Sequence, residues 1–243
     1  MNNLVFGIFP YIALAVLLIG SVARYERDPF TWKSSSSQLL RRRQLVIGSV
    51  LFHIGVLVIF FGHLFGLLIP VQVYEAFGIE PQAKQLLAAV AGGIAGVVAI
   101  VGALILAHRR LLDPRIRATS SFWDTTILLL LIAQLALGLI SVPISLATLA
   151  EGEVVLFMAW ALGIFTFDPA AASYLEHVNI VFKLHIFLGL TIFLVFPFTR
   201  LVHILSGLAA PIRYLLRPGY QLVRSRRKAA LPKRRATKAN PAE

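Results

Sequence analysis

Four histidines fall inside long apolar stretches of this 243-residue chain. His53 and His63 share one stretch, and His185 and His203 share another. An imidazole is costly in the hydrocarbon of a bilayer, so an intramembrane histidine usually marks a functional site with a partner. Four histidines that can face one another in two pairs suggest a metal cofactor held between two helices. Haem is the cofactor that best suits two opposed imidazoles.

The composition leaves few other ways to hold a metal. There is no cysteine, which excludes disulfides, iron–sulfur ligation, thiolate zinc sites and the covalent attachment of a c-type haem. Any haem must therefore be held non-covalently by histidine. Zinc sites on helices favour histidines at i and i+4 with further ligands nearby, and neither spacing here provides this. Structural histidines that are hydrogen-bonded to neighbouring helices remain the plain alternative.

Five apolar stretches are long enough to carry these residues across a bilayer. Hydrophobic residues make up 58% of the chain and the mean hydropathy is +0.81, which is typical of an integral membrane protein rather than a soluble domain. About 20 apolar residues cross a hydrocarbon core of about 30 Å. The sequence therefore predicts an all-α integral membrane protein, a bundle of five transmembrane helices: about Leu4–Ala23, Leu45–Ile69, Gln85–Ala107, Trp123–Ser145 and Ile180–Leu205.

Three other segments complete the predicted organisation. Val154–Phe167 is apolar but too short to span, which favours an interfacial helix. The first stretch lacks a basic leader region and a small-residue cleavage site, so we expect it to be retained. The last residues are rich in arginine, lysine, alanine and proline. We therefore predict a transmembrane domain over 1–220 and a partly disordered basic tail over 221–243.

The basic residues predict the orientation. Of the 23 lysines and arginines, all except Lys84 and Lys183 lie in the 24–43 loop, in the 108–121 loop or from Arg200 onward. Cytoplasmic loops carry such an excess. We expect a multi-pass protein of the inner (cytoplasmic) membrane with its N-terminus periplasmic and its C-terminus cytoplasmic. The net charge of +12 then reflects topology and attraction to anionic lipid, and we expect no nucleic-acid partner.

This orientation pairs the histidines. His53 is matched with His203 on the cytoplasmic side, and His63 with His185 on the periplasmic side. The rise from His53 to His63 is about 15 Å and that from His185 to His203 about 27 Å on straight helices. We therefore expect tilt or curvature to absorb the difference. Two haems with both axial positions filled have no open iron site, which favours electron transfer.

Short motifs along nearly the whole chain resemble one known family. The matching stretches are Tyr11–Ala13, 35–39, Leu51–Gly55 (LFHIG), Gly62–Gly66 (GHLFG), Tyr74–Ala76 (YEA), Ala91–Gly93 (AGG), Arg109–Thr119 (RRLLDPRIRAT), Lys183–His185 (KLH), Phe196–His203 (FPFTRLVH) and Tyr220–Arg224 (YQLVR). Together they are similar to the gamma subunit of respiratory nitrate reductase, a cytochrome b membrane anchor.

The resemblance implies a five-helix protein with two b-type haems, ligated by the same four histidines in the same pairs. It also implies quinol oxidation near the outer haem. Electrons would then pass to a cytoplasmic iron–sulfur beta subunit and a molybdenum-cofactor alpha subunit, which carries out nitrate reduction. The loop Phe77–Gln82 departs from the family pattern in length and content.

Four further residues are candidates for substrate or haem contacts. Lys84 matches a family lysine implicated in quinol binding and could bond a quinol oxygen, although a lysine snorkelling at a helix start explains it equally well. Gly62 could leave room for a quinol ring beside His63. Arg109 and Arg110 are placed to pair with propionates of the inner haem, and positive-inside anchoring is the alternative. We expect His108 and His177 to be structural.

Two other functions remain open at this point. A related dihaem, quinone-linked anchor could serve another cytoplasmic reductase, for example in sulfur or heterodisulfide metabolism. A haem-free transporter or membrane scaffold is the alternative from a different class.

Overall fold

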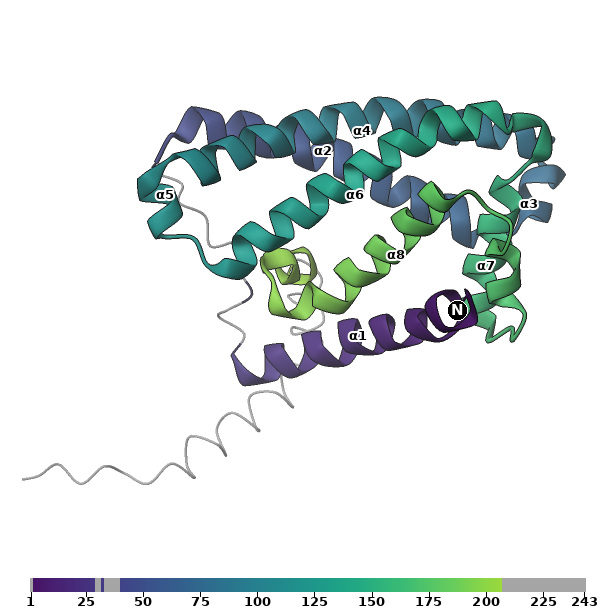
Figure 1. Ribbon diagram of the computed structural model, residues 1–243, viewed down its shortest axis with the longest axis horizontal. Helices are drawn as coiled ribbons and strands as arrows, with labels where there is room; N and C mark the ends of the chain where they lie inside the picture. Colours follow the sequence, from purple (N-terminus) through teal and green to yellow (C-terminus); the bar gives the residue numbers. More distant parts are fainter. Residues whose placement is uncertain (1, 29–31, 33–39, 207–243) are drawn as a thin grey trace, which may run out of the picture. The chain divides into compact units, whose positions relative to one another are not determined.

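Five helices of this chain are long and apolar enough to cross a membrane. The computed structural model describes residues 2–28, 32 and 40–206. The candidate spans are Leu4–Arg27, Arg42–Leu68, Pro81–Leu112, Phe122–Ala147 and Ile180–Phe198 (Figure 1). The predicted all-helical fold with five long apolar helices is confirmed. The chain divides into two compact units, Met1–Val202 and His203–Glu243, and all the helices below belong to the first. The predicted domain boundary at residue 220 lies outside the described residues.

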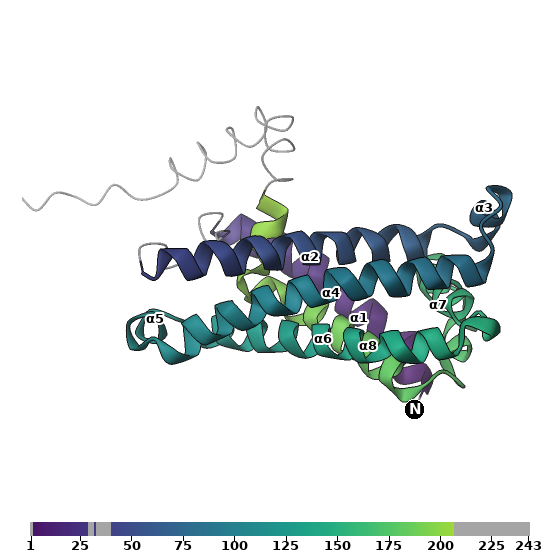
Figure 2. The same ribbon diagram turned by 90° about the horizontal axis from the view of Figure 1, so that it is seen from above.

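The long helices of the first unit follow one another in a simple packing order. α2 (Arg42–Leu68) packs on α4 (Pro81–Leu112), α4 on α6 (Phe122–Ala147), α6 on α8 (Ile180–Val195), and α8 on α1 (Phe9–Arg27). Figures 1 and 2 show this order from two sides. The shorter helices are η1 (Leu4–Ile8), α3 (Val71–Ala76), α5 (Pro114–Ala118), η3 (Leu149–Glu151), α7 (Val154–Thr166) and η4 (Ala171–Leu175).

Local sequence signals set where the helices start. Pro81 is the first residue of α4, where its missing N–H costs nothing and its fixed φ suits the helix. Ser121 and Asp124 form a reciprocal capping box at the start of α6, which satisfies two backbone donors that would otherwise be unpaired. The Asp113 carboxylate accepts from the backbone of Arg115 and Ile116 and so caps α5.

Glycines bring α2 and α4 into close contact. A Cβ at Gly55 would lie 2.5 Å from the carbonyl oxygen of Ala95, and a Cβ at Gly102 would lie 2.4 Å from the amide nitrogen of Phe52. Membrane helices associate through such small residues because hydrocarbon provides no hydrophobic drive between them. This contact fixes α2, and with it the two histidines that it carries.

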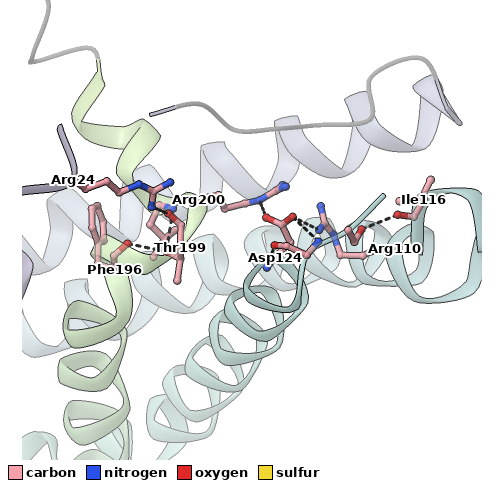
Figure 3. Close-up of polar contacts among 10 residues, drawn as sticks. Arg24, Arg110, Ile116, Asp124, Phe196, Thr199 and Arg200 are labelled. Carbon is pink, nitrogen blue, oxygen red and sulfur yellow. Dashed lines mark hydrogen bonds and ion pairs between the residues drawn. The ribbon is translucent and has the colours of Figure 1, made fainter. Parts of the chain in front are cut away.

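The fifth span differs from the prediction. A continuous helix to Leu205 was expected, but α8 ends at Val195 and is followed by the short 3₁₀ turns Phe196–Phe198 and Arg200–Val202. Pro197 removes a backbone donor, and Thr199 is extended. Arg24 donates to the carbonyls of Pro197 and Thr199 at 2.7 and 2.8 Å (Figure 3). Irregular backbone at membrane depth needs such partners. The straight-helix rise from His185 to His203 therefore does not apply.

A hydrophobic core lies around α7, which is too short to count as a span. The Trp160 indole donates to the carbonyl of Phe6 at 2.9 Å, and Trp160 belongs to a buried cluster with residues of η1, α1, η4 and α8. A short apolar helix was predicted here, and the structure packs it against the other helices. Its depth in a membrane stays a prediction.

Candidate functional site

His63 on α2 and His185 on α8 face each other. Their ring centroids are 6.1 Å apart and their planes are inclined by 37°. A metal–imidazole bond is about 2 Å long and a ring nitrogen lies about 1.1 Å from its centroid, so two imidazoles on opposite sides of one metal have centroids about 6 Å apart. The separation of the predicted outer pair therefore fits a metal ion between the rings. Ligation itself stays a prediction.

The hydrogen bonds of the α2 histidines leave Nε2 as the nitrogen suited to bind a metal. His63 Nδ1 lies 2.9 Å from the carbonyl oxygen of Ile59, and His53 Nδ1 lies 2.7 Å from that of Ser49. A carbonyl can only accept, so Nδ1 carries the proton in each neutral ring. Metal-bound histidines are commonly oriented by this kind of bond at the other ring nitrogen.

Among the described residues, the side chains around this pair do not form a site for a bare metal ion. Within the described part of the chain, there is no group of three or more His, Cys, Asp or Glu side chains that could hold a metal ion. Two histidines alone are too few ligands for a structural zinc site. They suffice for haem, whose porphyrin provides the other four ligands.

Two residues of α6 contact His185 and were missed by the sequence analysis. The Gln134 amide nitrogen lies 3.2 Å from His185 Nε2. A Cβ at Gly138 would lie 3.1 Å from His185 Cε1, so the imidazole lies against this glycine. A glutamine in the middle of an apolar span was the available signal, because an intramembrane polar side chain requires a partner.

The two histidines of the predicted inner pair fall on two different units. His53 lies on α2 in the first unit, and His203 begins the second unit, whose described residues are 203–206. The Ser206 hydroxyl donates to the carbonyl of His203 at 2.5 Å. The pairing of His53 with His203 stays a prediction.

Lys84 is buried at the start of α4. Its side chain is directed at the C-terminal end of α2, where Nζ donates to the carbonyl of Gly66 at 2.7 Å. Nζ also lies 4.7 Å from the centroid of the Tyr74 ring, and Lys84 as a whole is 6% exposed. This geometry differs from a snorkelling lysine, whose ammonium reaches solvent. An ammonium has three donors, and Gly66 uses one.

Open space lies at two glycines that flank His63 in the sequence. A Cβ at Gly62 or at Gly66 would meet no other atom within 4 Å. Tyr74 of the unpredicted helix α3 contacts this end of α2, because its hydroxyl donates to the carbonyl of Phe65 at 2.9 Å. His63, Gly62 and Lys84 are thereby gathered at the same end of α2, where the sequence predicted a quinol site.

Arg109 and Arg110 are buried at the opposite end of α4. Arg109 Nη2 donates to the carbonyl of Leu40 at 2.7 Å. Arg110 Nη1 lies 3.7 Å from Asp124, whose other oxygen accepts from Arg200 Nε at 2.8 Å (Figure 3). One carboxylate thus lies between two guanidinium groups. Arg110 Nη1 has no hydrogen-bond partner among the described residues, and a buried donor of this kind suits a bound carboxylate.

An exposed ion pair lies beside this arginine group. Arg41 Nε donates to Asp113 at 2.7 Å. Partial desolvation acts to raise the pKa of Asp113, but bonds from the Ile116 amide, the Arg41 guanidinium and the Arg115 amide outweigh it. The pKa of Asp113 therefore lies below its ordinary value, and this carboxylate stays charged at neutral pH.

Comparison with known proteins gives matches over most of the chain. The family model described as nitrate reductase gamma subunit matches residues 2–226. The chain is 46% identical over 226 residues to the respiratory nitrate reductase 1 gamma chain of Escherichia coli (strain K12), which covers 93% of this chain and 98% of that relative. It is 40% identical over 225 residues to the nitrate reductase gamma chain of Bacillus subtilis (strain 168), with 93% and 99% covered.

Proposed function

The chain belongs to the nitrate reductase gamma subunit family, and on that basis we propose that it oxidises quinol for a membrane-bound nitrate reductase complex. The observation that carries the proposal is the gathering of three features at one end of α2. These are the opposed His63–His185 pair, the open space at Gly62 and the buried ammonium of Lys84.

Four histidines would hold two b-type haems. His63 and His185 would hold the outer haem, and His53 and His203 the inner haem. When bound, the two haems would supply one-electron carriers at two depths of the membrane. Arg109 and Arg110 would hold propionate groups at the inner end. The burial of both arginines supports this role, as does Arg110 Nη1, which has no hydrogen-bond partner among the described residues.

Lys84 would act on the quinol itself. Oxidation of a quinol to a quinone releases two electrons and two protons, and negative charge develops on an oxygen as each proton leaves. A buried ammonium that is already held in place stabilises such charge without reorganisation. Gly66 and Tyr74 hold Lys84, and the missing side chain at Gly62 leaves room for the quinol ring.

The proposed partners follow from the orientation. The end of the bundle that carries Arg24, Arg41, Arg109, Arg110 and Arg200 would face the cytoplasm. An iron–sulfur beta subunit and a molybdenum alpha subunit would dock there and receive the electrons. Moving an electron inward against a membrane potential costs about 2.3 kcal/mol per 100 mV. Quinol oxidation at the outer side would therefore conserve energy as separated charge in the inner membrane.

Purification of the intact complex tests this proposal. We expect the chain to co-purify with an iron–sulfur and a molybdenum subunit, and the complex to reduce nitrate with a quinol as donor. Co-purification with a sulfur or heterodisulfide reductase and no nitrate activity would select the related anchor function. A complex that lacks b-type haem and does not oxidise quinol would leave only the scaffold role.

A further inference from the structure

The buried ammonium of Lys84 has no carboxylate partner among the described residues, whose ion pairs are all formed by arginines. Lys84 is 6% exposed, and a buried charge is costly unless other groups compensate for it. Two groups do so here. The Gly66 carbonyl oxygen lies 2.7 Å from Nζ, and the centroid of the Tyr74 ring lies 4.7 Å from it, which is within the range of a cation–π contact.

We propose that Tyr74 is the positioning residue of Lys84, and that its aromatic face stabilises the ammonium at the end of α2 without neutralising it. The inference rests on the proposed function, because it assumes that Lys84 acts on the quinol. The role of Tyr74 is indirect, since it acts through Lys84.

The end of α2 offers two backbone carbonyls to these side chains. In a continuing helix the carbonyl of Gly66 would accept from the amide of residue 70, but Pro70 has no N–H. Lys84 donates to this carbonyl, and the Tyr74 hydroxyl donates to the preceding one, that of Phe65, at 2.9 Å. The ammonium also lies at the negative end of the α2 dipole. Tyr74 is thus attached to the same helix turn that binds the ammonium.

The backbone after α3 keeps Tyr74 in place. The carbonyl of Tyr74 accepts from the amides of Phe77 and Ile79 at 3.0 and 2.9 Å. Gly78 lies between them with a φ of +73°, a conformation that residues with a Cβ rarely adopt. This closed turn fixes the backbone of Tyr74, so its ring needs little further ordering to contact the ammonium.

A neutral aromatic ring suits the proposed chemistry better than a counter-ion. A carboxylate in its place would neutralise the ammonium and repel the negative charge that develops on a quinol oxygen. An aromatic face attracts a cation through its quadrupole and carries no net charge. The positive charge of Lys84 therefore stays available to the quinol oxygen, and the ammonium is already in place when the negative charge develops.

The rate of haem reduction in variants of the intact complex tests the inference. The donor is menadiol, a quinol without an isoprenoid tail, mixed rapidly with the oxidised complex in the absence of nitrate. Tyr74→Phe keeps the aromatic face, and the Phe65 carbonyl keeps its bond from the Ile69 amide at 3.3 Å. Tyr74→Leu loses the aromatic face and the hydroxyl. A double-mutant cycle combines Tyr74→Leu with Lys84→Met.

A second tyrosine provides the control. The Tyr174 hydroxyl donates to Asp168 at 3.3 Å, within the segment that links α7 to α8, so Tyr174→Leu removes a tyrosine of the same chain away from Lys84. Spectra of each complex reduced with dithionite report its haem content, which we expect to be the same in all variants.

We expect Tyr74→Leu to lower the second-order rate constant for menadiol about five- to thirty-fold, as the loss of a desolvated cation–π contact implies. The loss should appear in the limiting rate at saturating menadiol, because the charge on the quinol oxygen develops only in the transition state. Tyr74→Phe should fall by at most about three-fold, and Tyr174→Leu should match wild type. In the Lys84→Met complex, Tyr74→Leu should have no further effect.

If Tyr74→Leu does not accumulate, fluorinated phenylalanines at position 74 replace it. Fluorine nearly keeps the size of the ring and weakens its negative face, so the rate should fall with each added fluorine. The inference is overturned if the rate is unchanged in Tyr74→Leu or across the fluorinated rings, if only the saturation by menadiol changes, or if Tyr74→Leu slows the Lys84→Met complex by the same factor. A wild-type complex whose haems menadiol does not reduce would instead overturn the proposed function.

Discussion

His63 and His185 approach each other with ring centroids 6.1 Å apart, although each of their helices packs mainly against other neighbours. α2 packs chiefly on α4, and α8 on α1 and α6. The two rings therefore approach each other between α2 and α8, two helices that do not pack closely against one another. A cofactor between them would complete the packing of these two helices.

Removal of one ring should remove one haem. We expect His63→Ala to lose the outer haem, halve the haem content of the purified complex and abolish quinol-dependent reduction of the remaining haem. His108→Ala is the control, because His108 is exposed at the end of α4. Optical difference spectra with a haem-to-protein ratio measure both variants. Full haem content and normal quinol-dependent reduction in His63→Ala would show that this histidine is no ligand.

Lys84→Met should impair quinol oxidation and leave the haems in place. Loss of the ammonium removes a charge-assisted bond, and such bonds contribute about 1.5–3 kcal/mol, which corresponds to a fall of about ten- to hundred-fold in kcat/KM for quinol. Lys183→Met is the matched control, because Lys183 also donates to a backbone carbonyl, that of Glu176 at 2.6 Å. Equal losses in the two variants would mean that Lys84 acts only as a structural cap of α2.

Gly138→Ala should disturb the outer haem alone. Its new Cβ would lie 3.1 Å from His185 Cε1, so the imidazole must shift by a few tenths of an ångström. We expect a changed midpoint potential or a lower occupancy of the outer haem. Redox titration measures both quantities. Gly92→Ala is the control, because a Cβ at Gly92 meets nothing within 4 Å. An unaltered outer haem in Gly138→Ala would argue against the position of the His185 ring described above.

Asp124→Asn should destabilise the end of the bundle that carries Arg110 and Arg200. The change leaves Arg110 and Arg200 without their shared counter-charge, and breaking a largely buried pair costs about 3 kcal/mol. An Asn side-chain oxygen can still accept from the Ser121 amide in the capping box, so the loss should come from the charge. Asp113→Asn is the comparison, because its partner Arg41 is 51% exposed and exposed pairs contribute about 0–1 kcal/mol. Thermal unfolding of the complex in detergent measures both, and equal Tm values for the two variants would contradict this prediction.

The long helices could be predicted from the sequence because each apolar residue in a run of about 20 adds to the evidence for a membrane-spanning helix. It did not predict the break after Val195, since Phe196, Pro197 and Phe198 are themselves apolar. Hydropathy does not record that Pro197 lacks a donor or that Arg24, far away in the chain, satisfies the freed carbonyls. Breaks of this kind depend on tertiary partners.

Part of the candidate site could also be predicted from the apolar pattern of the sequence. A histidine in an apolar stretch stands out from its neighbours, and this signal found His63 and His185. Gln134 carries the same signal on α6. Gly138, by contrast, cannot be told from the other glycines of membrane helices until the His185 ring is placed against it. The contact between Lys84 and Tyr74 depends on α3, a helix too short to leave a periodic pattern.

The haem content of the wild-type complex is the decisive measurement for the proposed haem sites. A reduced-minus-oxidised optical spectrum, combined with a haem and protein assay, gives the type of haem and its ratio to this chain. We expect b-type bands, two haems per chain and their reduction by added quinol. A spectrum without b-type bands, or haem that quinol does not reduce, would contradict this expectation.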